Sequence, residues 1–293
     1  MTAIKRLIPN LFTAGNLVGG ILAILFALTG HIVLAPYCIF ISALLDFLDG
    51  FMARLLKVPS ELGKQLDSLA DMVTFGVAPG IIVFVMLGSQ LPIFPELSTF
   101  GESISSYYIK DIIIDGEIIV EQNGISPTII NYGWHKFLPY FAFIIPVFAL
   151  FRLAKFNIDT RQSDSFIGLP TPAMTLYIAV LPLLYSSTMN QIALGELSTA
   201  SWEYSAATII SNPLFLMLSS LVLSILMVAE IPLFALKFKH FKIKGNEIRY
   251  LFLTIAIALL AILFFWALPL IIILYVLLSI INNQFVKART NEI

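Results

Sequence analysis

Charged side chains are scarce in this sequence. Only 12% of its 293 residues are Asp, Glu, Lys or Arg, against about a quarter in ordinary soluble proteins, and the mean hydropathy is +0.93. A water-exposed surface of this size needs far more charge. The composition excludes an ordinary soluble enzyme, a disordered chain and a nucleic-acid-binding protein, so we expect an integral membrane protein in a lipid bilayer with no nucleic acid as partner.

Cysteine and histidine are scarce as well. The single cysteine, Cys38, excludes an intramolecular disulfide and a cysteine-rich metal site. It lies in an apolar run and is expected to be a small core residue. The three histidines are scattered along the chain without the spacing of metal ligands.

Long apolar runs dominate the chain instead. A helix needs about 20 apolar residues to cross a bilayer, and the pattern predicts an all-α integral membrane protein with about eight transmembrane helices. We expect one membrane domain over residues 1–293, with a six-span core over 1–240 and two additional spans over 245–287. The eight stretches are Leu11–Leu28, Ile32–Leu55, Leu66–Leu87, Leu138–Phe156, Pro172–Ser187, Pro213–Leu236, Tyr250–Ala267 and Leu268–Phe285.

The basic residues are distributed unequally between the two sides of the predicted membrane. With eight spans, fifteen of the seventeen Lys and Arg residues fall on one side, together with both termini. The positive-inside rule makes that side cytoplasmic, and we expect the protein to lie in the cytoplasmic (inner) membrane. Pro9 and Asn10 interrupt the start of the first stretch and no small-residue cleavage site follows, so we expect it to be retained rather than cleaved as a signal peptide.

One excursion, residues 88–140, leaves the membrane on the opposite side. It is polar, and its Asp115-Gly116 dipeptide is flanked by isoleucines. That pattern predicts a small β-hairpin that forms a lid or cap. The sequence assigns no role to this excursion, nor to Glu230 near the end of the sixth stretch.

Four aspartates lie in the second and third predicted spans, where charge is costly and by default marks function. Asp46 and Asp49 are three residues apart, and Asp67 and Asp71 are four apart, so each pair shares one helix face. The short connection makes the two helices antiparallel neighbours. The two acidic faces are therefore expected to meet near the cytoplasmic end.

Carboxylates gathered at low dielectric need a counter-charge, and only two basic residues, Arg54 and Lys64, lie nearby. Divalent cations supply that charge, and all-oxygen ligation suits Mg²⁺, Mn²⁺ or Ca²⁺. Two metals about 3.5–4 Å apart, bridged by a carboxylate, are the arrangement used for phosphoryl-type displacement. We expect Asp46, Asp49, Asp67 and Asp71 to hold two such cations. The alternatives are helix packing or proton relay by the aspartates, and a cation transporter whose carboxylates bind the transported ion.

The spacing of these residues resembles that of a known family. Asp46-x-x-Asp49-Gly50-x-x-Ala53-Arg54, eight residues, then Gly63-x-x-x-Asp67-x-x-x-Asp71 matches the signature of the CDP-alcohol phosphatidyltransferases at every fixed position. The general resemblance covers about residues 9–157. Three further segments resemble the membrane-embedded phosphatidylserine synthases of bacteria and archaea, namely Ile8–Thr13, Arg152–Asn157 and Phe166–Ala173.

The resemblance implies a fold, a reaction and partners. The fold is the helical bundle of the CDP-alcohol phosphotransferases, and a homodimer is implied. The reaction transfers a phosphatidyl group from CDP-diacylglycerol to L-serine, giving phosphatidylserine and CMP with a divalent metal. Other acceptors of the same family, such as glycerol 3-phosphate or inositol phosphate, stay open. Asp71 is implied to be the base that takes the proton of the serine hydroxyl, with Asp46, Asp49 and Asp67 as the primary metal ligands.

The resemblance also implies substrate contacts, each with a simpler alternative. The residues implied to contact CDP-diacylglycerol are Asn10, Thr13, Gly50, Ala53, Arg54, Gly63 and Lys64. Asn10 and Thr13 are also ordinary helix N-capping types, while Arg54 and Lys64 also fit anchors at the cytoplasmic interface. Arg152, Lys155 and Asn157 are candidates for holding the serine carboxylate, although the positive-inside rule alone explains the two cations.

Overall fold

The structure is a computed structural model that describes residues 2–89, 110–114, 117–122, 125–130, 133–159, 165–234, 243 and 246–291. Its α-helices are α1 (Thr2–Leu28), α2 (Ala35–Leu55), α3 (Glu61–Asp71), α4 (Ala78–Ser89), α5 (Ile144–Ile158), α6 (Thr171–Ala193), α7 (Trp202–Ser211), α8 (Pro213–Val228), α9 (Glu247–Leu263) and α10 (Ala267–Asn291). The other helical segments are the π-helical η1 (Met72–Val77) and the 3-10 segments η3 (Gly133–Phe143) and η4 (Phe264–Trp266). The strands are β1 (Lys110–Ile114), β2 (Glu117–Gln122), β3 (Ile125–Ile130), β4 (Ser165–Ile167) and β5 (Pro232–Phe234).

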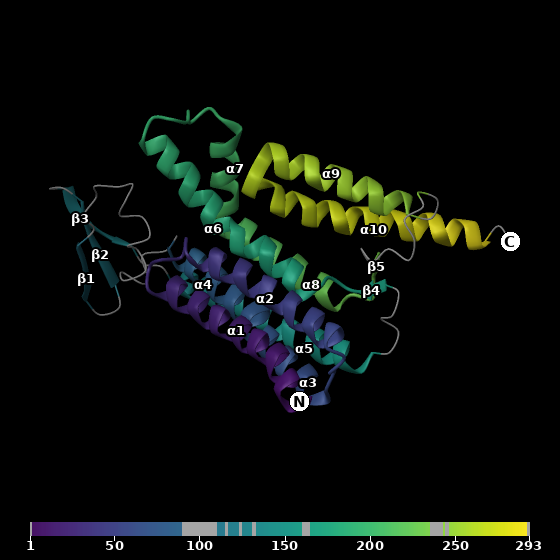
Figure 1. Cartoon of the computed structure of the whole chain (residues 1–293). Coiled ribbons are helices and arrows are strands. Elements are labelled where there is room, and N and C mark those ends of the chain that lie inside the picture. The colour runs from purple at the N-terminus through teal and green to yellow at the C-terminus, as the bar shows by residue number, and fades with distance from the viewer. Residues whose placement is uncertain are drawn as a thin grey trace.

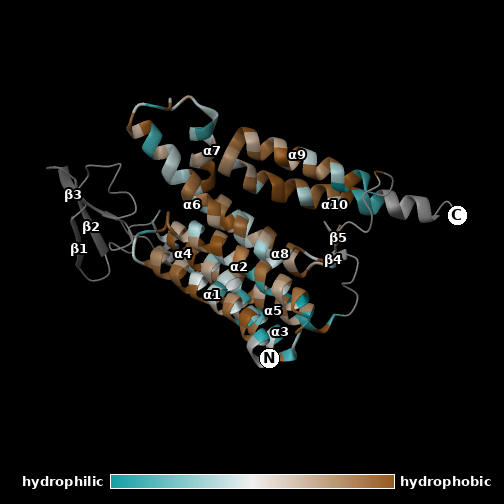
Figure 2. Cartoon of the chain, in the orientation of Figure 1, coloured by the Kyte–Doolittle hydropathy of each residue, from teal (hydrophilic) through white to brown (hydrophobic). Residues whose placement is uncertain are grey.

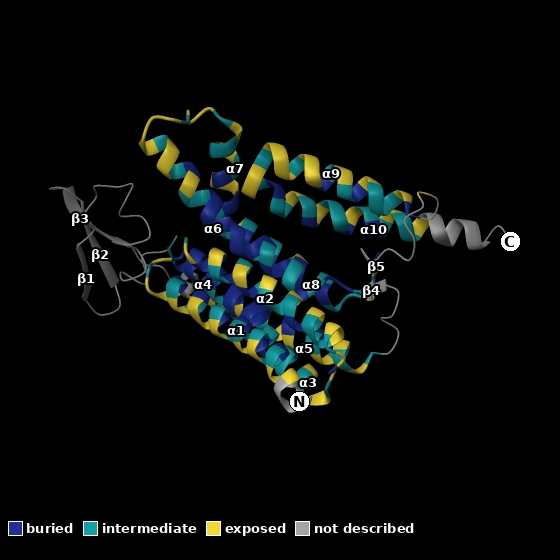
Figure 3. Ribbon diagram, in the orientation of Figure 1, coloured by how far each residue is buried: buried dark blue, intermediate teal, exposed yellow. Residues whose placement is uncertain are grey.

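The described helices pack as a bundle around α6, and the α9–α10 hairpin lies along one side (Figure 1). α6 contributes much of the buried core, including Met174, Ile178 and Leu181 (Figure 3). The outward faces are apolar too, as on α2, where Ile41, Leu44 and Phe47 are exposed. An apolar surface around an apolar core fits burial in lipid rather than water.

The all-α membrane fold predicted from the sequence is confirmed, and a helix lies at each of the eight predicted stretches. By length and apolar content, five helical stretches of the described chain can cross a membrane. They become six if α7 and α8, bent by 73°, count as one span. The five are Leu7–Leu28, Glu61–Ser89, Phe137–Ile158, Thr171–Ala193 and Glu247–Gln284.

The last of these stretches, Glu247–Gln284, is a hairpin rather than one rod. α9 and α10 run antiparallel, and the Phe252 and Tyr275 rings pack with centroids 5.7 Å apart (Figure 1). The sequence placed the break between these helices at residues 267–269, whereas the structure places it at η4, where Phe264 has φ 49°. The predicted boundary between a core and the hairpin, at 240–245, lies largely outside the described residues.

Two further boundaries differ from the prediction. The sixth stretch was expected to continue to Leu236, but α8 ends at Val228 and β5 follows, paired antiparallel with β4. Pro232 lacks a backbone N–H, so it cannot continue a helix and begins the strand instead. α7 was not predicted as a separate element. Its N-cap Ser201 accepts a hydrogen bond from the backbone N–H of Tyr204.

The excursion contains the predicted hairpin, which is confirmed. β1 and β2 pair antiparallel with Ile114 opposite Glu117, while the turn residues Asp115 and Gly116 lie outside the described residues. β3 adds a third strand that the sequence pattern did not reveal. The sheet lies away from the N-terminus, beyond the end of the bundle (Figure 1). The opposite end, where α3 meets the start of α1, carries hydrophilic residues (Figure 2).

The connection from α2 to α3 is short and shaped by local backbone chemistry. Lys57 has φ 53°, and Ser60 caps α3 by accepting a hydrogen bond from the Gly63 N–H at 3.0 Å. Asp71 is the last residue of α3, and the chain continues directly into the π-helical η1. π-Helical segments are rare and concentrate at functional sites. Thr175 of α6 donates a hydrogen bond to the Phe75 carbonyl within this segment at 2.8 Å.

Glycines let α1 approach its neighbours closely. A Cβ on Gly20 would come within 2.9 Å of Thr74 Cα, and one on Gly19 would overlap Ser42. The Thr74 and Ser42 hydroxyls both donate to the Asn16 carbonyl, at 3.0 and 3.2 Å. The close approach therefore brings α1, α2 and η1 into polar contact at one point.

This packing predicts that Gly20→Val destabilises the fold. The added methyl groups would push α1 away from η1, and overpacking of this kind costs about 1–3 kcal/mol. We expect the free energy of unfolding in detergent micelles to fall by that amount. Val18→Ala, at a position 54% exposed on the same helix, should change it by less than about 0.5 kcal/mol. Equal stability of the two variants would contradict the packing described.

Candidate active site

Three of the four predicted aspartates converge in one cluster. One carboxylate oxygen each from Asp46, Asp49 and Asp67 lies within 4.8 Å of the other two. The Asp46 carboxyl also contacts those of Asp67 and Asp71. The faces of α2 and α3 therefore meet as their spacing predicted.

α1 supplies hydrogen-bond donors to this cluster. The Thr13 hydroxyl donates to Asp49 Oδ2 at 2.6 Å and lies 3.2 Å from the Pro9 carbonyl. One turn further, the Asn16 amide donates through Nδ2 to Asp71 Oδ1 at 3.1 Å. Asp49 is only 6% exposed, so the orientation of its carboxylate is set by packing as well as by Thr13.

The cluster is not neutralised by basic side chains. Within the part of the chain that the structure describes, no Lys or Arg forms an ion pair with any of the four aspartates. Converging carboxylates without a counter-charge are costly at low dielectric. All the donors are carboxylate oxygens, which hard divalent cations prefer. The residues present therefore fit a divalent metal.

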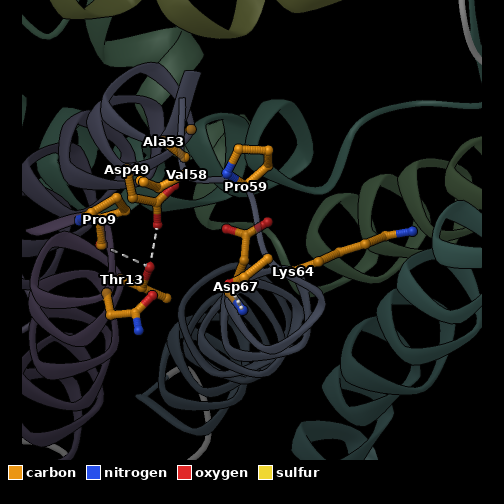
Figure 4. A pocket seen from close by; sticks show the side chains of 12 residues that line it. Pro9, Thr13, Asp49, Ala53, Val58, Pro59, Lys64 and Asp67 are labelled. Atoms are coloured by element: carbon orange, nitrogen blue, oxygen red, sulfur yellow. Dashed lines mark hydrogen bonds between the residues drawn. The ribbon is translucent and has the colours of Figure 1, made fainter. Parts of the chain in front are cut away.

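A pocket of about 200 Å³ opens beside the cluster. Asp49 of α2 and Asp67 of α3 lie on facing walls of it (Figure 4). Six of the seven residues implied to contact CDP-diacylglycerol line this pocket, namely Asn10, Thr13, Gly50, Ala53, Gly63 and Lys64. The other lining residues are Pro9, Val58, Pro59 and Ser60.

Glycine leaves room at two positions of the pocket wall. A Cβ on Gly63 would lie 3.1 Å from Ser60 Oγ, against the cap of α3. A Cβ on Gly50 would lie 3.8 Å from Arg54 Nη2. The Arg54 guanidinium is thus at the rim beside Gly50, although Arg54 is not among the residues lining the pocket.

The Lys64 side chain turns away from the pocket that its helix lines (Figure 4). Its ammonium donates to the Asn157 carbonyl at 2.9 Å, at the end of α5. The Asn157 amide donates in turn to Ser68 Oγ at 2.8 Å. These two bonds join α3 to α5 beside the pocket.

The three residues proposed for the acceptor lie on α5, and none of them lines the pocket. The Lys155 ammonium forms an ion pair with Glu230 at 3.0 Å, with the two side chains 39% and 64% exposed. Glu230, to which the sequence assigned no role, is thus the ion-pair partner of Lys155. Asn157 is held by Ser68, as described above.

Arg152 is the buried member of that set. It is 4% exposed, its Nε donates to the Leu169 carbonyl at 3.3 Å, and its guanidinium lies 5.3 Å from the centre of the Phe156 ring. α5 runs antiparallel to the α3–η1 segment, because Asn157 bonds to Ser68 and Ala149 packs against Gly76. This register puts Arg152 at the depth of Met72 and Val73, directly beyond Asp71.

Sequence reasoning missed Asn16, which contacts Asp71. The signal was present, because Asn10, Thr13 and Asn16 recur every three residues and form a polar stripe on an otherwise apolar helix. It also missed Ser60 and Thr175. Their roles depend on the local cap and on the π-helical segment, neither of which leaves a periodic pattern.

The family model of CDP-alcohol phosphatidyltransferase matches residues 6–103 of the chain. This match runs from within α1 to beyond α4, so it includes all four aspartates and every residue that lines the pocket. This part of the chain is therefore similar to the CDP-alcohol phosphatidyltransferase family.

Relatives with named activities cover more of the chain. It is 32% identical over 180 residues to the CDP-diacylglycerol–serine O-phosphatidyltransferase of Helicobacter pylori strain J99, across 61% of this chain and 58% of that protein. It is 29% identical over 240 residues to the Bacillus subtilis protein of the same name, across 82% of this chain and 94% of the relative. Archaetidylserine synthase of Methanothermobacter thermautotrophicus is 26% identical over 204 residues, across 67% and 69%. The chain thus aligns with little more than half of the Helicobacter protein.

The Thr13–Asp49 hydrogen bond predicts an effect on metal affinity. Thr13→Val keeps the shape of the side chain but removes the donor that orients Asp49. Loss of such an outer contact weakens metal binding by roughly 10–100-fold, and we expect this range for Mn²⁺ binding followed by electron paramagnetic resonance.

The matched control for this measurement is Thr29→Val. Thr29 is an exposed threonine at the end of the same helix, and its hydroxyl bonds to the Leu25 carbonyl. Its variant should bind Mn²⁺ like the wild type. Unchanged Mn²⁺ affinity in Thr13→Val would exclude Thr13 from the support of a metal site.

Proposed function

We propose that the protein transfers the phosphatidyl group of CDP-diacylglycerol to L-serine, giving phosphatidylserine and CMP. The observation that carries this proposal is the convergence of Asp46, Asp49 and Asp67 within 4.8 Å beside a pocket. The names of the relatives favour serine as the acceptor. The shared family domain supports the cytidine-linked donor.

Asp46, Asp49 and Asp67 would hold two divalent cations, Mg²⁺ or Mn²⁺, with Asp71 beside the second. When bound, the cations neutralise the diphosphate and the charge that builds on the departing phosphate. Thr13 keeps Asp49 oriented toward the cluster. The connection between α2 and α3 is short and ends at the Ser60 cap, which keeps the two acidic faces together.

Asp71 would act as the base. It takes the proton from the serine hydroxyl, whose oxygen forms a bond to the phosphorus that carries the diacylglycerol. The bond between that phosphorus and the bridging oxygen of the diphosphate breaks, and CMP leaves with the electron pair. General-base help of this kind contributes about 10²–10⁴-fold to a rate.

The pocket is the proposed nucleotide site. Asn10 and Thr13 from α1, Gly50 and Ala53 from α2, and Gly63 from α3 would contact the cytidine diphosphate. Arg54, at the rim beside Gly50, would reach the phosphates. Lys64 would join them by leaving the Asn157 carbonyl, because its exposed side chain can rotate toward the pocket.

Arg152 is the proposed holder of the serine carboxylate. It lies at the depth of Met72, next to Asp71 along the antiparallel helices. A planar guanidinium binds a carboxylate through two parallel hydrogen bonds, and in the described part of the chain the bond from Arg152 to the Leu169 carbonyl uses Nε. Asn157, between Ser68 and Lys64, would border this subsite. Lys155 would take part only after leaving Glu230.

The site is proposed to face the cytoplasm from the inner membrane. The pocket lies at the hydrophilic end of the bundle, with α3 and the start of α1 (Figure 2). The basic loops of the sequence support that orientation, although residues 160–164 and 235–242 lie outside the described part of the chain. On the family resemblance, the protein is also proposed to form a homodimer.

An acceptor screen tests the proposed reaction. Purified protein with CDP-diacylglycerol, labelled serine and Mn²⁺ should release CMP and form phosphatidylserine in equal amounts. Product with glycerol 3-phosphate or an inositol phosphate but none with serine would change the acceptor. Metal flux into vesicles without CMP release would show that the protein is a cation transporter and not this enzyme.

Asp71→Asn is expected to lower kcat at least 100-fold. The amide cannot take the proton of the hydroxyl, which explains the loss of turnover. It has nearly the same volume as the carboxyl, so folding and membrane insertion should persist. Glu203→Gln, at the start of α7 and outside the cluster, is the matched control and should keep full activity. Wild-type turnover by Asp71→Asn would remove Asp71 as the base.

Arg152→Ala is expected to raise the KM for serine about tenfold or more while leaving the KM for CDP-diacylglycerol within about twofold, since a lost charged hydrogen bond is worth roughly 1.5–3 kcal/mol. Lys155→Ala removes a nearby cation that pairs with Glu230 at the exposed surface, and should change the serine KM little. A larger effect of Lys155→Ala than of Arg152→Ala would reverse the assignment of the acceptor subsite.

A further inference from the structure

Asn16 is the one amide that contacts Asp71 among the described residues. Its side chain is fully buried, with Nδ2 donating to Asp71 Oδ1 at 3.1 Å. Its other polar atom, Oδ1, is buried and has no hydrogen-bond partner in the described part of the chain. A buried amide with one unsatisfied atom is costly and calls for an explanation.

The fold itself does not require this side chain. The backbone carbonyl of Asn16, not its amide, receives the Ser42 and Thr74 hydroxyls that tie α1 to α2 and η1. Leucine has nearly the same shape as asparagine and would fill an apolar site without an unsatisfied atom. The polar end of Asn16 is therefore explained by what it contacts, which is Asp71.

The contact is suited to orienting a base. Asp71 ends α3 where the backbone passes into the π-helical η1, so its side chain leaves the helix at a local irregularity. The amide engages Oδ1 and so fixes the direction in which the second oxygen, Oδ2, points. α1 thus supports two carboxylates with different proposed roles. Thr13 holds Asp49, a metal ligand, and Asn16 holds Asp71, the base.

We propose that Asn16 is a positioning residue for Asp71, whose amide holds the carboxylate in the orientation that accepts the acceptor's proton. The inference rests on the proposed function, because it gives Asp71 the role of base. It assigns Asn16 to the proton-transfer step and not to the binding of metal or nucleotide.

The test separates orientation from packing and from metal binding. Asn16→Leu keeps the branching of the side chain in a larger, apolar form and removes the donor, and Asn16→Ser is a smaller variant whose hydroxyl is too short to reach Asp71. Both should lower kcat about 10–100-fold, since misplacement of a catalytic group by about 1 Å costs about 100-fold. The KM for CDP-diacylglycerol and the Kd for Mn²⁺ should stay within about twofold, because Asp46, Asp49 and Asp67 keep their contacts.

The matched control is Ser42→Ala, which removes a hydrogen bond to the carbonyl of the same Asn16 but leaves the amide in place. Its kcat should stay within about twofold of wild type. An equal loss in Ser42→Ala, a parallel loss of Mn²⁺ affinity in both Asn16 variants, or an unchanged kcat would each overturn the proposal. If Asn16→Leu does not fold, Asn16→Ser decides alone.

The same measurements separate this proposal from the proposed reaction. If the wild type uses another acceptor alcohol, the serine assignment fails and the variants are compared with that acceptor instead. If the wild type releases no CMP with any acceptor, the failure lies in the wild type and both proposals fall. A loss confined to the Asn16 variants supports the positioning role.

Discussion

The central constraint on this protein is the mutual repulsion of carboxylates gathered inside a membrane bundle. Asp46, Asp49 and Asp67 lie within 4.8 Å of one another, and no basic side chain of the described chain pairs with them. An apolar bundle gains nothing from such a cluster unless a ligand compensates its charge. The arrangement is therefore explained by the binding of divalent cations. It is not explained by a contribution to the stability of the fold.

Much of the local structure serves to hold this cluster together. The Ser60 cap begins α3 a few residues after α2 ends, and Gly19 and Gly20 let α1 lie close against α2 and η1. That closeness lets α1 deliver Thr13 to Asp49 and Asn16 to Asp71. The result is a set of helices in which the carboxylates of Asp49 and Asp67 line an open pocket.

The all-α membrane fold and the meeting of the acidic faces were predictable because both follow from periodicity. Apolar runs of span length define helices, and three- and four-residue spacings put Asp46 with Asp49 and Asp67 with Asp71 on shared faces. The π-helical η1, the end of α8 at Val228 and the ion pair of Lys155 with Glu230 were not predictable. They depend on tertiary contacts between segments far apart in sequence, such as Thr175 with the Phe75 carbonyl.

The most direct test of the account is the position of bound metal. An anomalous difference map from crystals of the protein soaked in Mn²⁺ should show two peaks about 3.5–4 Å apart, both in contact with carboxylates of Asp46, Asp49 and Asp67. Peaks elsewhere in the protein, or a cluster that stays without metal at saturating Mn²⁺, would contradict it.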